Sequence, residues 1–248
     1  MEARGGGRGT LSVVPAAPPT AMDHYLYAVA ERLPRSWRPP AAGVTTAAVE
    51  ARRVGDLSVI SSALDQAPRE GPRLSSLHHE VVATAMSAAA VVPLPCRTVV
   101  PSDEVDGWLA LHEPLLRATL AYVRGRVEMN VRLLHLAWRH DRLRSPGHAS
   151  VRSMDAGELR ELAERLAEHA GAVEWRFRAE GSARNVAASA AFLLPRDETG
   201  DFLARIGPIA SRTPAVAVVP TGPWPPYSFV PAFRPAPVRE DLAPSARV

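Results

Sequence analysis

Two adjacent histidines followed by a glutamate, His78, His79 and Glu80, are the residue types in this chain best suited to metal binding or acid–base chemistry. They fall in a stretch whose apolar residues recur every three or four positions, which predicts a helix. Neighbouring residues of a helix point about 100° apart, so the two histidines cannot both face one metal ion. Zinc-binding helices place their histidines four positions apart. We therefore predict a polar helix face with at most one interface histidine, and no metal site.

Cys96 is the chain's one cysteine, which excludes an intrachain disulfide and a thiolate-rich metal site. It lies in an apolar stretch, where a lone cysteine is typically a small core residue. The sequence has no glycine-rich nucleotide-binding motif after a strand, no Gly-x-Ser-x-Gly motif and no lysine for a phosphate-binding loop. We therefore predict a protein that is not an enzyme and holds no cofactor.

Positive charge is concentrated between residues 124 and 152. All 29 basic residues of the chain are arginine, and seven of them fall in this segment. The segment is either a docking patch for an acidic partner or nucleic acid, or a solvated linker and strand face. Its candidate partner-binding residues are Arg124, Arg126 and Arg132.

A segment rich in proline and aromatic residues, 222–229, is the most unusual feature of the sequence, and we call it the strap. Its prolines fix the backbone φ angle and remove amide donors, which excludes a helix or a central strand. Its three aromatic side chains favour burial. The strap therefore packs on its own domain or docks a partner. In the second case its contact residues are Trp224, Pro225, Pro226, Tyr227 and Phe229.

The N-terminal part predicts a mixed sheet with two helices. Gly55-Asp56 suits the turn of a hairpin between two of the strands. Apolar spacing predicts a helix over 74–90 and a second helix with Ser102 as N-cap, which Pro114 should kink or split. The predicted strands cover residues 24–30, 49–54, 57–62 and 91–100.

From residue 127 onward the predicted elements follow the order βαββαβ of a ferredoxin-like unit. The helix over 155–171 has well-defined ends, because Asp155 and Glu158 form a capping box and Gly171 is a stop signal. Glu161 and Arg165 can pair on its surface. The six elements are expected at 127–136, 155–171, 173–178, 186–194, 197–211 and 216–219.

Ferredoxin-like sheets also serve as RNA-binding scaffolds, which leaves a second interpretation open. Trp175 and Phe177 share one face of a predicted strand, as the base-stacking aromatics of such sheets do. The glycine- and aromatic-rich motif of those RNA-binding domains is absent, so the pattern does not favour nucleic acid. The alternative is a ferredoxin-like ligand- or RNA-binding module that uses the basic segment 124–152.

These patterns together predict an α+β protein of two small domains. The boundaries are 23–126 for the mixed-sheet domain and 127–233 for the ferredoxin-like domain, although the strand at 127–136 could belong to either. Residues 1–22 and 234–248 have the composition of disordered ends. No apolar run approaches the roughly 18 residues of a membrane-spanning helix. The N-terminal residues lack a continuous apolar core, so we expect no signal peptide. We therefore expect a cytoplasmic protein with no membrane contact.

Five pieces of the sequence, in this order, resemble the GvpF/GvpL family of gas vesicle accessory proteins. The Gly-Arg-Val-Glu-Met piece and the strap are specific in combination, and the others are weak individually. The pieces are Tyr25-Leu26-Tyr27, His78-His79-Glu80-Val81-Val82, Val91-Val92-Pro93-Leu94 with Thr98-Val99-Val100-Pro101-Ser102, Arg124-Gly125-Arg126-Val127-Glu128-Met129-Asn130-Val131, and Gly222-Pro223-Trp224-Pro225-Pro226-Tyr227-Ser228-Phe229.

The resemblance implies a non-enzymatic protein of two α+β domains that works with gas vesicles. Such proteins bind the small hydrophobic shell protein GvpA, keep it from aggregating and assist vesicle assembly beside other accessory proteins. Some remain as minor vesicle components. One departure stands out: the family usually has Leu-Arg-Phe-Gly-Thr where this chain has Leu94-Pro95-Cys96-Arg97-Thr98. If that segment contacts the partner, this chain is expected to bind it differently or weakly.

Overall fold

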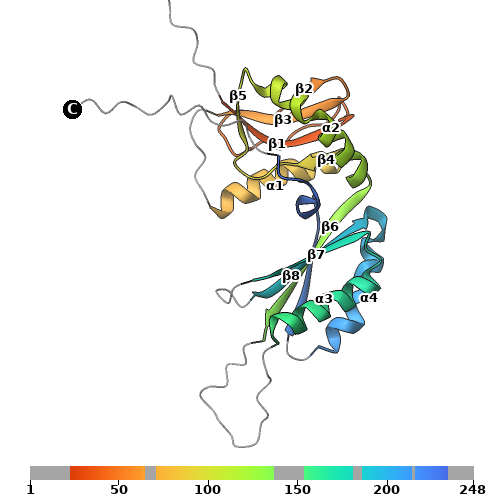
Figure 1. Cartoon of the computed structure of the whole chain (residues 1–248). Coiled ribbons are helices and arrows are strands. Elements are labelled where there is room, and N and C mark those ends of the chain that lie inside the picture. Colours follow the sequence, from red (N-terminus) through yellow and green to blue (C-terminus); the bar gives the residue numbers. More distant parts are fainter. Residues whose placement is uncertain (1–22, 65–70, 137–153, 181–185, 214–215, 234–248) are drawn as a thin grey trace, which may run out of the picture.

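The computed structural model describes residues 23–64, 71–136, 154–180, 186–213 and 216–233. The predicted disordered ends, 1–22 and 234–248, lie outside these residues, as does part of the basic segment. The described chain forms two antiparallel sheets with four α-helices, which confirms the predicted α+β class (Figure 1). None of the described helices is long and apolar enough to span a membrane.

The first sheet is built around a central strand, β1, that is buried along most of its length. The strand order is β2-β3-β1-β4, and β5 also pairs with β1. The predicted hairpin is present, since β2 and β3 pair on either side of Gly55-Asp56. The strands are β1 (Asp23–Glu31), β2 (Glu50–Val54), β3 (Leu57–Leu64), β4 (Ala90–Pro93) and β5 (Val99–Pro101).

Two helices cover the two faces of this first sheet. Helix α1 (Pro72–Met86) packs on the face that carries Tyr25 and Tyr27. Helix α2 (Val105–Val123) packs on the face that carries Leu26. Burial on both sides explains why β1 reads as a near-continuous apolar run rather than an alternating one.

The structure corrects the predicted N-cap of α2 and the predicted split at Pro114. The helix begins at Val105, three residues beyond the predicted N-cap Ser102, and its N-terminus has no side-chain cap. Pro114 does not split the helix, because it lies on the exposed side. There the carbonyl that lacks a backbone donor can be hydrated.

The second sheet has the order β7-β8-β6-β9, and α3 and α4 cover one of its faces. The predicted βαββαβ element order is present, and the strand order is compatible with a ferredoxin-like unit. Strand β6 pairs with β8 and β9, whereas the side chain of Val127 packs in the core of the first sheet. The elements are β6 (Arg126–His135), α3 (Ala156–Ala170), β7 (Glu174–Ala179), β8 (Val186–Pro195), η2 (Arg196–Glu198), α4 (Thr199–Ser211), β9 (Val216–Trp224) and η3 (Tyr227–Phe229).

The predicted ends of α3 are confirmed. The Asp155 carboxylate accepts from the Glu158 amide, and the Glu158 carboxylate accepts from the Asp155 amide, which completes the capping box. Gly171 ends the helix in the left-handed conformation. The surface ion pair of this helix is Arg160–Glu164 rather than the predicted Glu161–Arg165.

The turn between β4 and β5 contains a backbone conformation that its residue does not favour. Arg97 has a φ angle of 71°, in the left-handed region where a side chain clashes with its own backbone. Glycine adopts this conformation without that cost. This is the position at which the resembled family usually has glycine.

We expect Arg97→Gly to raise the free energy of unfolding by about 1 kcal/mol, because it removes the left-handed strain. Arg97→Ala is the matched control, since it also removes the guanidinium but keeps the strain. Urea denaturation of the three proteins measures the difference. A glycine variant no more stable than the alanine variant would contradict the explanation.

Candidate functional site

The strap lies at the junction between the two sheets, where it leaves the end of edge strand β9. Pro225, Pro226 and Phe229 are buried, and Trp224 and Tyr227 are partly buried. The prediction that the strap excludes a helix is wrong over its last residues, because η3 is one turn of 3-10 helix after the final proline. In Figure 1 it is the dark-blue turn between the upper and lower halves. The strap therefore contacts its own chain on both sides.

Helix α1 provides the strap's neighbours on the side of the first sheet. The ring centroids of Trp224 and His79 are 4.7 Å apart, in an edge-on arrangement. The Tyr227 ring lies 6.2 Å from that of His78. The Tyr227 hydroxyl is buried and has no hydrogen-bond partner among the described residues. Packing of the ring, rather than a polar contact, therefore holds Tyr227 in place.

Strand β6 provides the strap's neighbour on the side of the second sheet. The side chain of Glu128 is only 2% exposed. Its carboxylate accepts from the Ser228 backbone amide and the Ser228 hydroxyl, both at 2.8 Å, and from the Asn130 side-chain amide at 2.7 Å. Burial raises the pKa of Glu128, while these donors favour the ionised form. Glu128 belongs to the Gly-Arg-Val-Glu-Met piece and Ser228 to the strap, so the two most specific pieces of the sequence are joined by these hydrogen bonds.

His78 is a core residue rather than part of the predicted polar helix face. It is 1% exposed, and its Nε2 donates to the Leu94 carbonyl at 3.0 Å. Nδ1 therefore accepts from the Tyr25 hydroxyl at 2.9 Å. Burial lowers the pKa of His78 to about 4, so the ring is neutral. The neighbouring His79 points to Trp224 instead, as expected for adjacent helical residues whose side chains point in different directions.

The described residues include no group of three histidine, cysteine or acidic side chains that could hold a metal ion. Cys96 is exposed, so the prediction that it packs in the core is wrong. It lies in the exposed turn after β4, where the apolar stretch leaves the sheet. Desolvation raises the pKa of its thiol, which disfavours the reactive thiolate.

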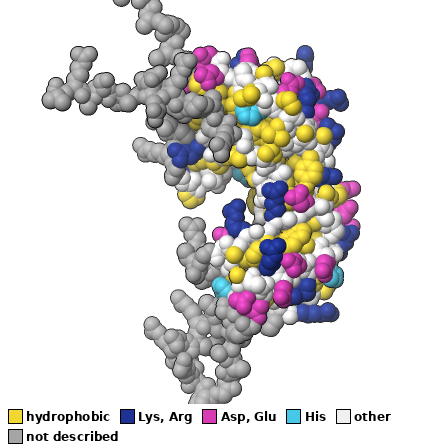
Figure 2. All heavy atoms as spheres, in the orientation of Figure 1, with side chains coloured by type: hydrophobic (Ala, Val, Ile, Leu, Met, Phe, Trp, Pro, Cys, Tyr) yellow, Lys and Arg dark blue, Asp and Glu magenta, His cyan; other side chains and the backbone are white. Residues whose placement is uncertain are grey.

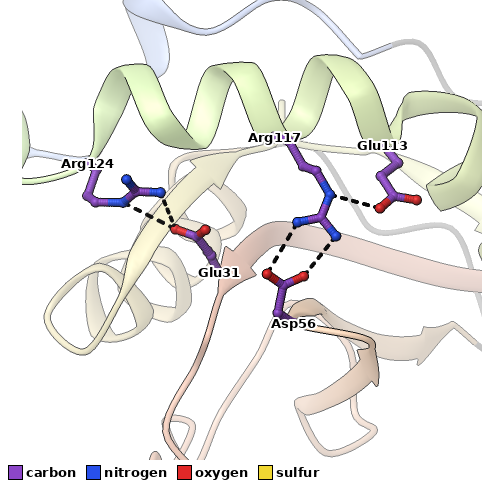
Figure 3. A network of polar contacts seen from close by, with 5 residues as sticks. All are labelled: Glu31, Asp56, Glu113, Arg117 and Arg124. Carbon is purple, nitrogen blue, oxygen red and sulfur yellow. Dashed lines mark hydrogen bonds and ion pairs between the residues drawn. The ribbon is translucent and has the colours of Figure 1, made fainter.

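The three predicted arginines have separate surroundings. Arg124 forms an ion pair with Glu31 of β1 at 2.7 Å, next to the contacts of Arg117 with Asp56 and Glu113 (Figure 3). Arg126 donates to the carbonyl of Tyr122 and stacks over its ring. Arg132 is exposed on the second sheet. Within the described chain, the predicted basic segment therefore forms no single patch.

Trp175 and Phe177 share one face of β7, as predicted, but it is the face that α3 and α4 cover. Both side chains pack against the helical core, and Arg160 of α3 lies over the Phe177 ring. Bases cannot stack on a covered face. One of the two observations behind the RNA-binding alternative, the shared face of Trp175 and Phe177, therefore has no support in the fold.

The opposite, open face of the second sheet forms the floor of a groove with a volume of about 1090 Å³. The strap and α1 form its wall through Trp224, Tyr227 and His79. Three arginines of the sheet line the groove, Arg132, Arg176 and Arg178, and we call it the arginine groove. Figure 2 shows the hollow between the two halves, with arginine side chains on the lower half beside it.

Comparisons with known proteins agree with this architecture. The family model of the gas vesicle synthesis protein GvpL/GvpF matches residues 23–144 and 139–231. The crystal structure of the gas vesicle protein GvpF from Anabaena sp. PCC7120 is similar at 18% identity, with a TM-score of 0.65 over 84% of this chain and 95% of that one. The crystal structure of GvpF from Microcystis aeruginosa is similar at 15% identity, with a TM-score of 0.64 over 84% and 98%. No curated protein matches. Because the family model covers nearly all of the described residues, the chain belongs to the GvpL/GvpF family of gas vesicle synthesis proteins.

Proposed function

We propose that this chain is a non-enzymatic accessory protein of gas vesicle formation. It binds the hydrophobic shell protein GvpA, keeps it from aggregating and assists vesicle assembly. It acts in the cytoplasm and is retained with the vesicle as a minor component. The observation that supports the proposal is the family match across both halves of the chain.

The proposal is tested by expressing the shell protein with and without this chain. The expected result is a larger soluble fraction of shell protein, which co-purifies with a tag on this chain. Shell protein that stays equally insoluble, with none captured on the tag, would sink the proposal.

An apolar partner needs an apolar surface, and α2 offers one. Leu111 is 78% exposed and Leu115 is 47% exposed. The two leucines are four positions apart on a helix, so they lie on the same face. Burial of apolar area contributes about 25 cal/mol per Å², so two leucines can supply a useful part of the binding free energy. We propose this face of α2 as a contact for the shell protein.

We expect Leu111→Ser/Leu115→Ser to reduce capture of the shell protein at least about tenfold, because about 2 kcal/mol of apolar burial is lost. The matched control is Val173→Ser/Leu203→Ser, which removes two side chains of 49% and 43% exposure in the second half. Quantitative pull-down and thermal unfolding measure binding and folding separately. Equal loss in both variants would reject α2 as the contact.

The strap is better explained as a clamp between the two halves than as a docking element. Its buried prolines and Phe229 are not available to a partner. Ser228 satisfies a buried carboxylate of β6, and Trp224 packs on α1. The family resemblance of the strap then reflects a structural role.

We expect Trp224→Ala/Tyr227→Ala to lower the free energy of unfolding by about 3 kcal/mol, because it removes two ring contacts across the junction. Capture of the shell protein by the folded variant should be unchanged. Tyr227→Phe is the control that keeps the ring, and it should be at least as stable as the unmodified chain because its buried hydroxyl has no partner. Loss of capture with normal stability would show that the strap docks a partner.

A further inference from the structure

A row of side chains across the floor of the arginine groove takes no part in the contacts described above. In the strand register, Ser189 of β8 lies opposite Arg132 of β6 on one side and Arg178 of β7 on the other. Residues at matching register positions share a face of the sheet, and this row is on the open face. The two arginines are therefore two strand spacings apart, roughly 10 Å between Cα atoms. The small serine between them leaves space above the sheet.

The two guanidinium groups of this row have no counter-ion within the described part of the chain. Glu174 pairs with Arg176, whereas Glu180 accepts from the Ser189 hydroxyl at 3.0 Å and so lies beside the row without forming an ion pair with Arg132 or Arg178. Both Arg132 and Arg178 are exposed, so their side chains can reorient. Two unpaired cations that flank a small residue form a receptor for an anionic group.

We propose that the arginine groove binds an acidic segment of a partner protein, with a carboxylate held between Arg132 and Arg178 above Ser189. The planar guanidinium matches a carboxylate with two parallel hydrogen bonds. The next row places Arg176 and Asn130 on either side of Ala191. Arg176 pairs with Glu174 and Asn130 donates to Glu128, so this row offers a second residue of the segment only their remaining N–H groups. Trp224 at the wall suits an apolar residue between the acids.

A peptide fits this groove better than a nucleic acid does. The two aromatic side chains of β7, Trp175 and Phe177, pack against the helices on the covered face. The groove also contains the carboxylates of Glu128 and Glu180, which would repel a continuous phosphate backbone. A peptide with a few spaced carboxylates can place one of them between Arg132 and Arg178 and keep the others away from Glu128 and Glu180.

The inference goes beyond the proposed function and does not depend on it. Capture of the shell protein is assigned to the leucines of α2, whereas the acidic segment is assigned to the second sheet. Either surface can fail its test while the other passes.

The test uses the full chain and a fluorescein-labelled peptide of six glutamates, with a six-glutamine peptide as the control for the label. Fluorescence anisotropy should show saturable binding of the glutamate peptide that weakens with added salt. Arg132→Gln/Arg178→Gln should weaken it at least about tenfold, because charge-assisted hydrogen bonds are lost. Ser189→Leu, which fills the slot without changing charge, should weaken it as well.

The matched control is Arg165→Gln/Arg212→Gln, which removes the same charge from exposed positions on α3 and after α4. It should leave the affinity within about twofold. Equal weakening by the two double variants, or no binding to the unmodified chain, would overturn the proposal. Tighter binding of a labelled oligouridylate that depends on the same arginines would overturn it in favour of a nucleic-acid site.

Discussion

The buried carboxylate of Glu128 is the constraint on which the junction depends. A carboxylate that is almost fully buried is costly unless donors surround it. Two of its three donors belong to Ser228, which is 100 residues further along the chain. The register of β6 with β9 brings Trp224 opposite Glu128, so the strap begins where its contact is needed. The strap must then turn back over β6 for Ser228 to reach the carboxylate.

Close packing at the start of the strap explains its first residue. A Cβ atom added to Gly222 would lie 2.9 Å from the Glu128 carbonyl oxygen and 2.7 Å from the Met129 sulfur. Its φ angle of 130° is also one that side chains rarely adopt. Other contacts also join the two halves, such as the hydrogen bond that the Arg196 side chain donates to the Met86 carbonyl at 2.7 Å. The contacts that close the junction therefore also position the wall of the arginine groove.

The elements that the sequence predicted well are those with local signals. The hairpin at Gly55 and the capping box at Asp155 depend on residues within a few positions of one another. Local sequence patterns are therefore enough to predict both. His78 could not be placed in this way, because its partners Tyr25 and Leu94 are 53 and 16 residues away. The arginine groove likewise combines a feature that local sequence predicts with one that depends on long-range strand pairing. In the sequence, Arg132 alternates with the apolar Val131 and Leu133, which is enough to put it on one side of its strand. Its alignment with Ser189 and Arg178 depends on the register of three strands.

The departure at Cys96-Arg97 bears on the core of the first half rather than on the groove. The amide of Arg97 donates to the Tyr25 hydroxyl at 3.1 Å, and that hydroxyl donates to His78. His78 in turn donates to the carbonyl of Leu94. This chain of hydrogen bonds takes only a backbone amide and a backbone carbonyl from the turn, and any residue other than proline supplies the amide. The turn can therefore lose the family's phenylalanine and glycine and keep these three hydrogen bonds, at the cost of the strained φ angle of Arg97.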